Sequence, residues 1–244
     1  MNPGISNVSV SARPEEKLLE RCLRVSVGSE NVLTVPELVR QVDDWERLFR
    51  VASRHGIAPL VCHILNQIDA SEIPASGLAR RQAATRRQAM RSAQITGALV
   101  ELLDLLEANR IPAVPFKGPV LAFLLYGDAK CRESADLDVL ISARDVLRAK
   151  DVMVAHGYRT DCPTDPAAQA AYLRVRYELH FVSPDGPCPV ELHQAFLPPF
   201  NQLAYDYDAL WQRLERIRLY DRDVLVLPPE DLLLALCAHS TKHK

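Results

Sequence analysis

The sequence has little glycine, no marked excess of charge and no long apolar run. Its 244 residues include nine glycines, which excludes a glycine-rich repeat. Lysine and arginine number 29 against 31 aspartates and glutamates, a net charge of −2, so the basic excess typical of nucleic-acid and membrane-surface binders is missing. The longest apolar runs, residues 120–126 and 232–238, are too short to span a bilayer. We therefore expect neither a membrane nor a nucleic acid as partner.

Close cysteine spacing is missing as well. The sequence contains six cysteines, Cys22, Cys62, Cys131, Cys162, Cys188 and Cys237. No two of them show the C-x-x-C spacing of zinc and redox motifs. Because the first residues do not form the apolar segment of a signal peptide, we interpret the cysteines as reduced thiols and expect a cytoplasmic protein.

Acidic residues do not occur between Glu72 and Glu101, a stretch that contains five arginines. Arg80, Arg87 and Arg91 share one stripe of a predicted helix, at spacings of seven and four residues. A solvated helix face accounts for such a charge run. A basic wall that faces a polyanionic ligand is the alternative.

The periodicity of the sequence changes near residue 110, from helical spacing to strands mixed with helices. We expect a loose tail at 1–13, a helical region at 14–110, an α+β domain at 111–227 and, at 228–244, the start of a C-terminal helix without a stop signal. The helical region includes one helix from Pro36 to Gly56 and a long helix over 78–110. The predicted strands are residues 113–116, 136–142, 176–182, 189–194 and 224–227. This order predicts the α+β class.

Two aspartates, Asp136 and Asp138, are the strongest chemical signal. They lie two residues apart in a predicted strand, so both side chains should point to the same face, opposite the apolar side chains at 137, 139 and 141. Two half-buried carboxylates repel each other unless a cation joins them. Magnesium prefers one or two carboxylates together with phosphate oxygens and water. Without the metal, replacing either aspartate should leave the stability unchanged or raise it.

The tripeptide Lys117-Gly118-Pro119 stands between a predicted strand and a short apolar helix. Glycine lets the backbone approach a ligand closely, and the start of the helix offers free N–H groups to phosphate. Lys117 would add a mobile positive charge. The alternative is an ordinary turn with Lys117 in solvent. Tyr126, at the end of the same helix, either stacks on a nucleobase or packs in the core.

A predicted hairpin brings acidic and imidazole groups together. If Val182 pairs with Pro189, the same register places His180 opposite Glu191 and Glu178 opposite His193. Glu191 and His193 then share a face of the sheet. Three interpretations stay open here: a solvated polar face, a zinc site from His180, His193 and a carboxylate, or imidazole neighbours for the carboxylate of Glu191.

These motifs, in this order, resemble a largely uncharacterised nucleotidyltransferase family of bacterial biosynthetic clusters, within the DNA-polymerase-beta-like superfamily. The resemblance covers about residues 40–244. It rests on the segments Trp45–Leu48, His55–Leu60, Phe116–Gly118, Leu125–Asp128, Arg132, Asp136–Ile141, Val190–His193, His239 and His243–Lys244. It implies an α+β fold with a small mixed sheet flanked by helices, preceded here by the helical N-terminal region.

The resemblance also implies a mechanism. Asp136, Asp138 and Glu191 would hold two Mg²⁺ ions, for which Mn²⁺ can substitute, and Glu191 would favour deprotonation of an acceptor hydroxyl. That hydroxyl would attack the α-phosphorus of a nucleoside triphosphate such as ATP, and pyrophosphate would leave. Lys117 and Gly118 would hold phosphate, with Arg132 near the same charge. The acceptor would be a small molecule or a peptide.

Two departures from the superfamily and two alternative functions follow from the same residues. Better-known members carry Gly-Ser at the phosphate turn, where this chain has Lys-Gly-Pro, and relatives have glycine where Ala135 precedes the first aspartate.

One alternative function is a nucleotide-binding or regulatory module on the same fold without turnover. The other is an unrelated zinc-dependent hydrolase that uses His180, Glu191 and His193.

Overall fold

The structure is a computed structural model that describes residues 13–184, 186–197 and 205–240. The predicted tail at 1–13, except Arg13, lies outside the described residues, as do Asp185 of the expected hairpin turn and the final pair His243–Lys244. The chain forms two compact units, 1–89 and 90–244, which divide inside the helix α5 (Ala75–Ala108). The predicted change in sequence periodicity near residue 110 lies just after the end of this helix.

The first unit is entirely helical in its described part. It contains α1 (Pro14–Ser26), the short 3-10 helix η1 (Val32–Thr34), α2 (Val35–Val39), α3 (Trp45–Arg54), α4 (Ala58–Leu65), the 3-10 helix η2 (Ala70–Glu72) and the first turns of α5. Its core includes Leu18, Leu48, Leu65 and the buried ring of Trp45. Trp45 therefore serves core packing, as its position on an apolar helix stripe predicts.

One predicted helix in this unit is wrong. Residues 36–56 do not form a continuous helix, because the chain leaves the helical conformation between α2 and α3. Asp44 caps the start of α3, where its side-chain oxygen accepts a hydrogen bond from the backbone N–H of Arg47 at 2.8 Å. Aspartate is a strong N-cap residue, and this cap signal competes with the apolar stripe that suggests one helix.

The arginines of α5 are largely engaged within the chain. Arg80 forms an ion pair with Glu46, and Arg81 donates a hydrogen bond to the carbonyl of Leu65 at 2.7 Å. Within the second unit, Arg91 donates to the carbonyl of Pro187 at 2.9 Å. These contacts hold three of the five arginines to neighbouring segments, so the alternative of a basic wall for a polyanion receives no support from them.

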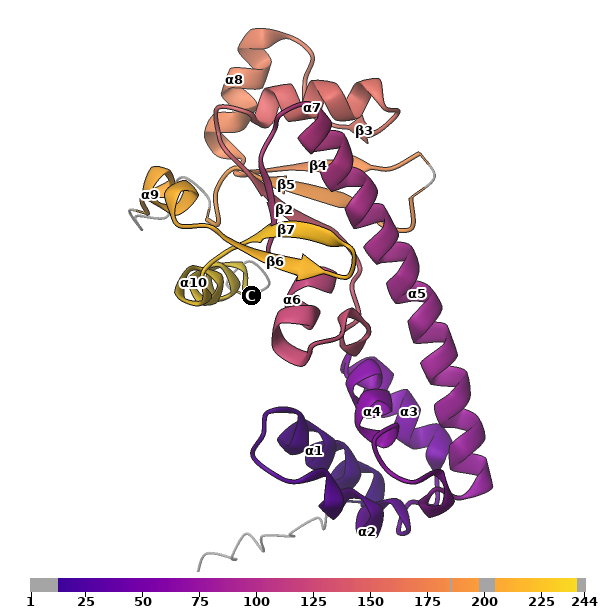
Figure 1. The fold of residues 1–244 in the computed structure, drawn as a ribbon. Coiled ribbons are helices and arrows are strands. Elements are labelled where there is room, and N and C mark those ends of the chain that lie inside the picture. The colour runs from indigo at the N-terminus through magenta and orange to yellow at the C-terminus, as the bar shows by residue number, and fades with distance from the viewer. Residues whose placement is uncertain (1–12, 185, 198–204, 241–244) are drawn as a thin grey trace, which may run out of the picture. The chain divides into compact units, whose positions relative to one another are not determined.

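The second unit is built on a five-stranded mixed sheet, which confirms the predicted α+β class. The sheet order is β1-β2-β5-β4-β3 (Figure 1), from the strands β1 (Ala113–Pro115), β2 (Leu137–Ile141), β3 (Arg159–Thr160), β4 (Glu178–Val182) and β5 (Val190–His193). The strands β2 and β5 are parallel, and the other neighbours are antiparallel. A separate hairpin pairs β6 (Glu215–Leu219) with β7 (Arg222–Val226).

Helices accompany this sheet. They are α6 (Gly118–Tyr126), the 3-10 helix η3 (Ala129–Cys131), α7 (Val146–Ala155), α8 (Pro166–Val175), α9 (Tyr207–Gln212) and α10 (Pro229–Ser240). The helix α9 is short and ends at Gln212, and residues from Glu215 onward pair as β6. The short strand β3 and the helix α8 were not predicted. Among the described residues, no helix is both long and apolar enough to cross a membrane.

The interior strand β2, second in the sheet, is buried on both faces. Leu137, Val139 and Ile141 pack in one core with the last turns of α5 and with α7, as predicted from the alternation of the strand. Leu140 joins a second core with residues of α9 and α10. Because alternate side chains of a strand share a face, Asp138 lies on the side of Leu140, toward α9 and α10.

Candidate functional site

The registers of three neighbouring strands bring the predicted acidic residues together. In the parallel pair β2–β5, Asp138 stands beside Glu191. In the antiparallel pair β4–β5, His180 stands opposite Glu191, and Glu178 opposite His193. The hairpin register predicted from the sequence is therefore confirmed. It places these five side chains on one face of the sheet, although 52 residues lie between Asp138 and Glu191 in the sequence.

Asp138 is the most buried carboxylate of this cluster, with no exposed side-chain surface. Its Oδ1 atom accepts hydrogen bonds from Lys117 Nζ at 2.5 Å and from His193 Nε2 at 3.0 Å. Burial alone would raise its pKa, but the hydrogen bond and charge of His193, together with the charge of Lys117, lower the pKa of Asp138 to about 2. The carboxylate is therefore ionised at neutral pH.

The second carboxylate oxygen of Asp138 differs from the first in its hydrogen bonding. Oδ2 is buried and has no hydrogen-bond partner among the described residues. An unpartnered buried carboxylate oxygen costs free energy, and such an atom often marks the place of a ligand that is not part of the chain.

His193 links three carboxylates. Besides Asp138, its Nε2 lies 3.5 Å from Glu191 Oε2, and its Nδ1 lies 3.6 Å from Glu178 Oε2. Burial works against a charged imidazole, yet the hydrogen bonds to Asp138 and Glu191 and the charge of Glu178 raise the pKa of His193. The ring of Phe116 packs edge-on against it, 5.1 Å between centroids. His193 is thus a fixed donor that orients Asp138.

His180 lies on the other side of Glu191. Its Nδ1 is 3.3 Å from Glu191 Oε1, and its Nε2 is 3.3 Å from Glu178 Oε1. The imidazoles of His180 and His193 therefore both lie beside the carboxylate of Glu191, as predicted. His180 is the more exposed of the two, with 42 % of its side-chain surface accessible, whereas His193 is enclosed.

Lys117 does not lie in solvent. The residue caps the start of α6, is 6 % exposed, and places Nζ between Asp138 Oδ1 and His239 Nε2, which is 3.1 Å away on α10. The alternative of an ordinary turn with Lys117 in solvent is wrong, because the ammonium group pairs with the buried carboxylate of Asp138. The sequence offered no spacing signal for His239, which stands 122 residues from Lys117.

Gly118 adopts a left-handed backbone with φ of +60°, a conformation that glycine takes without strain. A side chain there would come within 3.5 Å of Ser134 Oγ and 3.7 Å of the Asp136 carbonyl oxygen. The turn between β1 and α6 therefore lies against the segment that leads into β2. Pro119 occupies the first helical turn, as predicted.

Asp136 stands just before β2, not within it. Its side chain is half-buried, and burial, followed by the charge of Asp138, raises the pKa of Asp136. The positive charge of Arg132 acts on the same carboxyl group in the opposite direction. Arg132 is thus near this charge, as the resemblance implies.

Tyr126 is remote from the turn. It is the last residue of α6, a helix of nine residues that begins at Gly118. At a rise of about 1.5 Å per residue, the two ends of this helix are about 12 Å apart. Base stacking by Tyr126 beside the phosphate turn therefore has no support from its position.

Three side chains bring potential metal-ligand atoms close together. Asp138, Glu191 and His193 each offer one ligand atom, and these atoms lie within 4.8 Å of one another. Asp138 Oδ2 supplies a buried oxygen that lacks a partner among the described residues. Carboxylate oxygens suit Mg²⁺ and Mn²⁺, so the residues present fit a divalent cation. Asp136 is not one of these three residues. It lies just before β2 and would contribute a further carboxylate at the border of the group.

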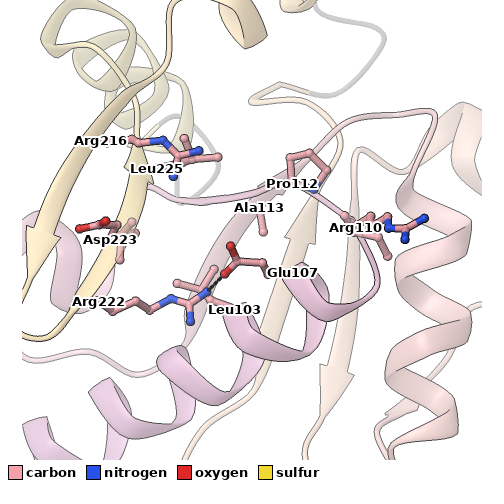
Figure 2. A pocket seen from close by; sticks show the side chains of 11 residues that line it. Leu103, Glu107, Arg110, Pro112, Ala113, Arg216, Arg222, Asp223 and Leu225 are labelled. Atoms are coloured by element: carbon pink, nitrogen blue, oxygen red, sulfur yellow. Dashed lines mark hydrogen bonds and ion pairs between the residues drawn. The ribbon is translucent and has the colours of Figure 1, made fainter.

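A pocket of about 310 Å³ lies elsewhere in the second unit (Figure 2). It is lined by the end of α5, by β1 and by the β6–β7 hairpin, and Arg222 pairs with Glu107 across it at 2.7 Å. Ala113, at the far end of β1 from Lys117, forms part of its wall. None of the predicted site residues lines this pocket, so it is separate from the acidic cluster.

Comparison with known proteins gives one match. The family described as uncharacterised nucleotidyltransferase matches residues 41–244, which include the whole acidic cluster. No curated protein and no solved structure matches the chain. The family match overturns the alternative of an unrelated hydrolase.

Proposed function

Because the chain belongs to the family of uncharacterised nucleotidyltransferases, we propose that it moves a nucleoside monophosphate group from a nucleoside triphosphate to an acceptor. The acceptor nucleophile is a hydroxyl or similar group of a small molecule or peptide. The bond between the α- and β-phosphates breaks, a new bond joins the α-phosphorus to the acceptor oxygen, and pyrophosphate leaves. The acceptor's proton passes to a base or to water.

One observation carries this proposal. Asp138 and Glu191 occupy paired positions on adjacent parallel strands, and Asp138 Oδ2 is buried without a partner among the described residues. Asp138, Glu191 and, from the edge, Asp136 would hold the divalent metal. When bound, Mg²⁺ would supply charge stabilisation at the phosphates and would favour ionisation of the acceptor hydroxyl.

The residues of the chain divide the remaining work. His193 holds Asp138 through Oδ1, which leaves Oδ2 for the cation. Glu191 is the more accessible ligand, with 14 % of its side-chain surface exposed, and lies where an acceptor hydroxyl could be oriented. Phosphate binding falls to Arg132, which already acts on Asp136, and to the N–H groups at the start of α6 near Gly118.

A second candidate is a nucleotide-binding module on the same fold without turnover. The observation that favours it is the ion pair between Lys117 and Asp138, because a carboxylate already neutralised by a buried ammonium group attracts a metal less strongly. Transfer activity separates the two candidates, since both predict nucleotide binding.

The test is a calorimetric titration with ATP, GTP, CTP and UTP, each in Mg²⁺ and in chelator. One triphosphate should bind in Mg²⁺ only, and this binding should be lost in Asp136→Asn. Asp221→Asn, at an exposed turn residue of the β6–β7 hairpin, serves as the control. Pyrophosphate release with hydroxyl acceptors then reports turnover. Failure of every triphosphate to bind would refute the proposed function.

A further inference from the structure

Lys117 is held in place from three directions. Its backbone caps α6 and is followed by the left-handed Gly118, which lies against Ser134 and the Asp136 carbonyl. Its ammonium group touches Asp138 on one side and His239 on the other. Since only 6 % of the residue is exposed, the charge has been removed from water and is compensated mainly by Asp138.

Lys117 also contacts the carboxylate that a metal would share, through the oxygen opposite the one left for the metal. Asp138 Oδ1 accepts the ammonium group at 2.5 Å, a charge-assisted contact of short length. A cation that approaches Asp138 therefore meets a carboxylate whose charge is already balanced. Glu191 and Glu178 lie within 3.6 Å of His193, which donates to the same Asp138 oxygen as Lys117 does. Lys117 is therefore one of two donors that hold this oxygen.

We propose that Lys117 is the resident counter-ion of Asp138, a positioning residue that keeps the affinity of the site for free divalent metal low until a nucleotide supplies further oxygen ligands. The inference rests on the proposed function and deepens it, because it concerns how the same site takes up its metal. It assigns Lys117 a role on the carboxylate, in place of the phosphate contact that the resemblance implies.

The two roles of Lys117 lead to opposite expectations. If the ammonium group balances Asp138, removing its charge leaves a buried carboxylate in need of a cation, and metal binds more tightly in the absence of nucleotide. If the ammonium group binds phosphate, the same change leaves metal binding alone unaltered and weakens the binding of nucleotide.

The experiment is a Mn²⁺ titration of the full chain followed by electron paramagnetic resonance, with and without the triphosphate that binds best. Lys117→Met removes the charge at similar length, Lys117→Gln keeps a donor for Asp138 Oδ1, and Lys117→Arg keeps the charge. Lys150→Met is the matched control, because Lys150 is 7 % exposed and pairs with Asp151 at 2.6 Å in α7, outside the cluster.

Without nucleotide, the dissociation constant for Mn²⁺ should fall about tenfold or more in Lys117→Met and Lys117→Gln, as expected when a compensating unit charge is lost. It should stay near the wild-type value in Lys117→Arg and Lys150→Met. The melting temperature of the metal-free protein identifies a variant that does not fold. If Lys117→Met does not fold, Lys117→Gln still tests the loss of the charge.

Two results would overturn the inference, and they differ in what they say of the function. Equal Mn²⁺ affinity in wild type and both neutral variants, with weaker nucleotide binding, would make Lys117 a phosphate ligand and leave the proposed transferase intact. Failure of Mn²⁺ to bind any folded form, even with nucleotide, would refute the counter-ion role and the proposed function together.

Discussion

His193 Nε2 lies 3.0 Å from Asp138 Oδ1, and both side chains are almost completely enclosed by the protein. The imidazole comes from β5 and the carboxylate from β2, at neighbouring positions of the parallel pair. This contact directs one oxygen of Asp138 away from the place where a metal would bind. The acidic site is thus built with its own supporting donor, and the roles of its carboxylates can be separated by substitution.

Asp138→Asn should destabilise the metal-free protein. The structure corrects the expectation that removing either aspartate only relieves repulsion, because Asp138 compensates the buried Lys117 and His193. Loss of one partner of a buried ion pair costs about 3–5 kcal/mol of unfolding free energy. Urea denaturation in chelator measures this loss directly.

Asp136→Asn should behave differently in the same measurement. Asp136 is half-buried, and burial and the charge of Asp138 raise its pKa. Neutralising it removes an unfavourable charge, so the unfolding free energy should stay within about 0.5 kcal/mol of wild type or rise slightly. Metal-dependent nucleotide binding should nevertheless be lost. An equal loss of stability in Asp136→Asn and Asp138→Asn would contradict this assignment.

Glu191→Gln should separate binding from transfer. Glu191 is the accessible carboxylate of the close group, and its amide analogue keeps the shape of the site. We expect nucleotide to bind within a few-fold of wild type while transfer falls by about 100-fold or more, the range for loss of an acid–base group. Radiolabelled nucleotide transfer measures the second effect. Glu215→Gln, at an exposed position of β6, should change neither.

The anchoring of α10 should depend on acid pH through Asp231. Arg213 donates two hydrogen bonds of 2.7 Å to its carboxylate, and Tyr205 donates a third. The hydrogen bonds from Arg213 outweigh burial, so the pKa of Asp231 is lowered in the folded protein. Its contribution to stability is therefore complete above the unfolded value near 3.8 and is lost as pH falls through the lower folded pKa.

Asp231→Asn tests this contribution. At neutral pH the variant should lose about 1–2 kcal/mol, a value reduced because Arg213 is partly exposed. The difference from wild type should shrink as the pH falls below about 4. Thermal melts at pH 7, 5 and 3 measure it. A difference that stayed constant down to pH 3 would show that ionisation of Asp231 is not the cause.

Gly118→Ala should cost stability through its backbone. The left-handed conformation at Gly118, with φ of +60°, disfavours a side chain by about 1–2 kcal/mol, whereas the nearest atom, at 3.5 Å, is in ordinary contact. Gly97→Ala is the control, because Gly97 lies in α5 with no atom within 4 Å of the added carbon. That change should stabilise by up to about 1 kcal/mol. Chemical denaturation of the pair distinguishes strain from crowding.

Local signals in the sequence predict part of this site well. The hairpin register that places His180 opposite Glu191 follows from a turn signal and strict alternation, and the structure confirms it. The division of β2 into a face with Val139 and a face with Asp138 follows from the same two-residue period.

Contacts between distant segments were not predictable from spacing. The partner of Lys117 is 21 residues away, on the neighbouring strand β2, and His239 reaches it from the last helix. The break before α3 depends on one capping residue, Asp44, in competition with a continuous apolar stripe. In each case a tertiary or capping interaction outweighs the local pattern.

The parallel pairing of β2 with β5 also bears on how the protein folds. The 52 residues between Asp138 and Glu191 must close into a loop before the two strands pair, and such non-local pairing is slow because loop closure precedes any stabilising contact. The hairpin of β4 and β5 can form earlier, since its contacts are local. The acidic cluster is therefore expected to assemble late, because a chain in which β5 has not yet paired with β2 lacks Glu191 and His193 beside Asp138.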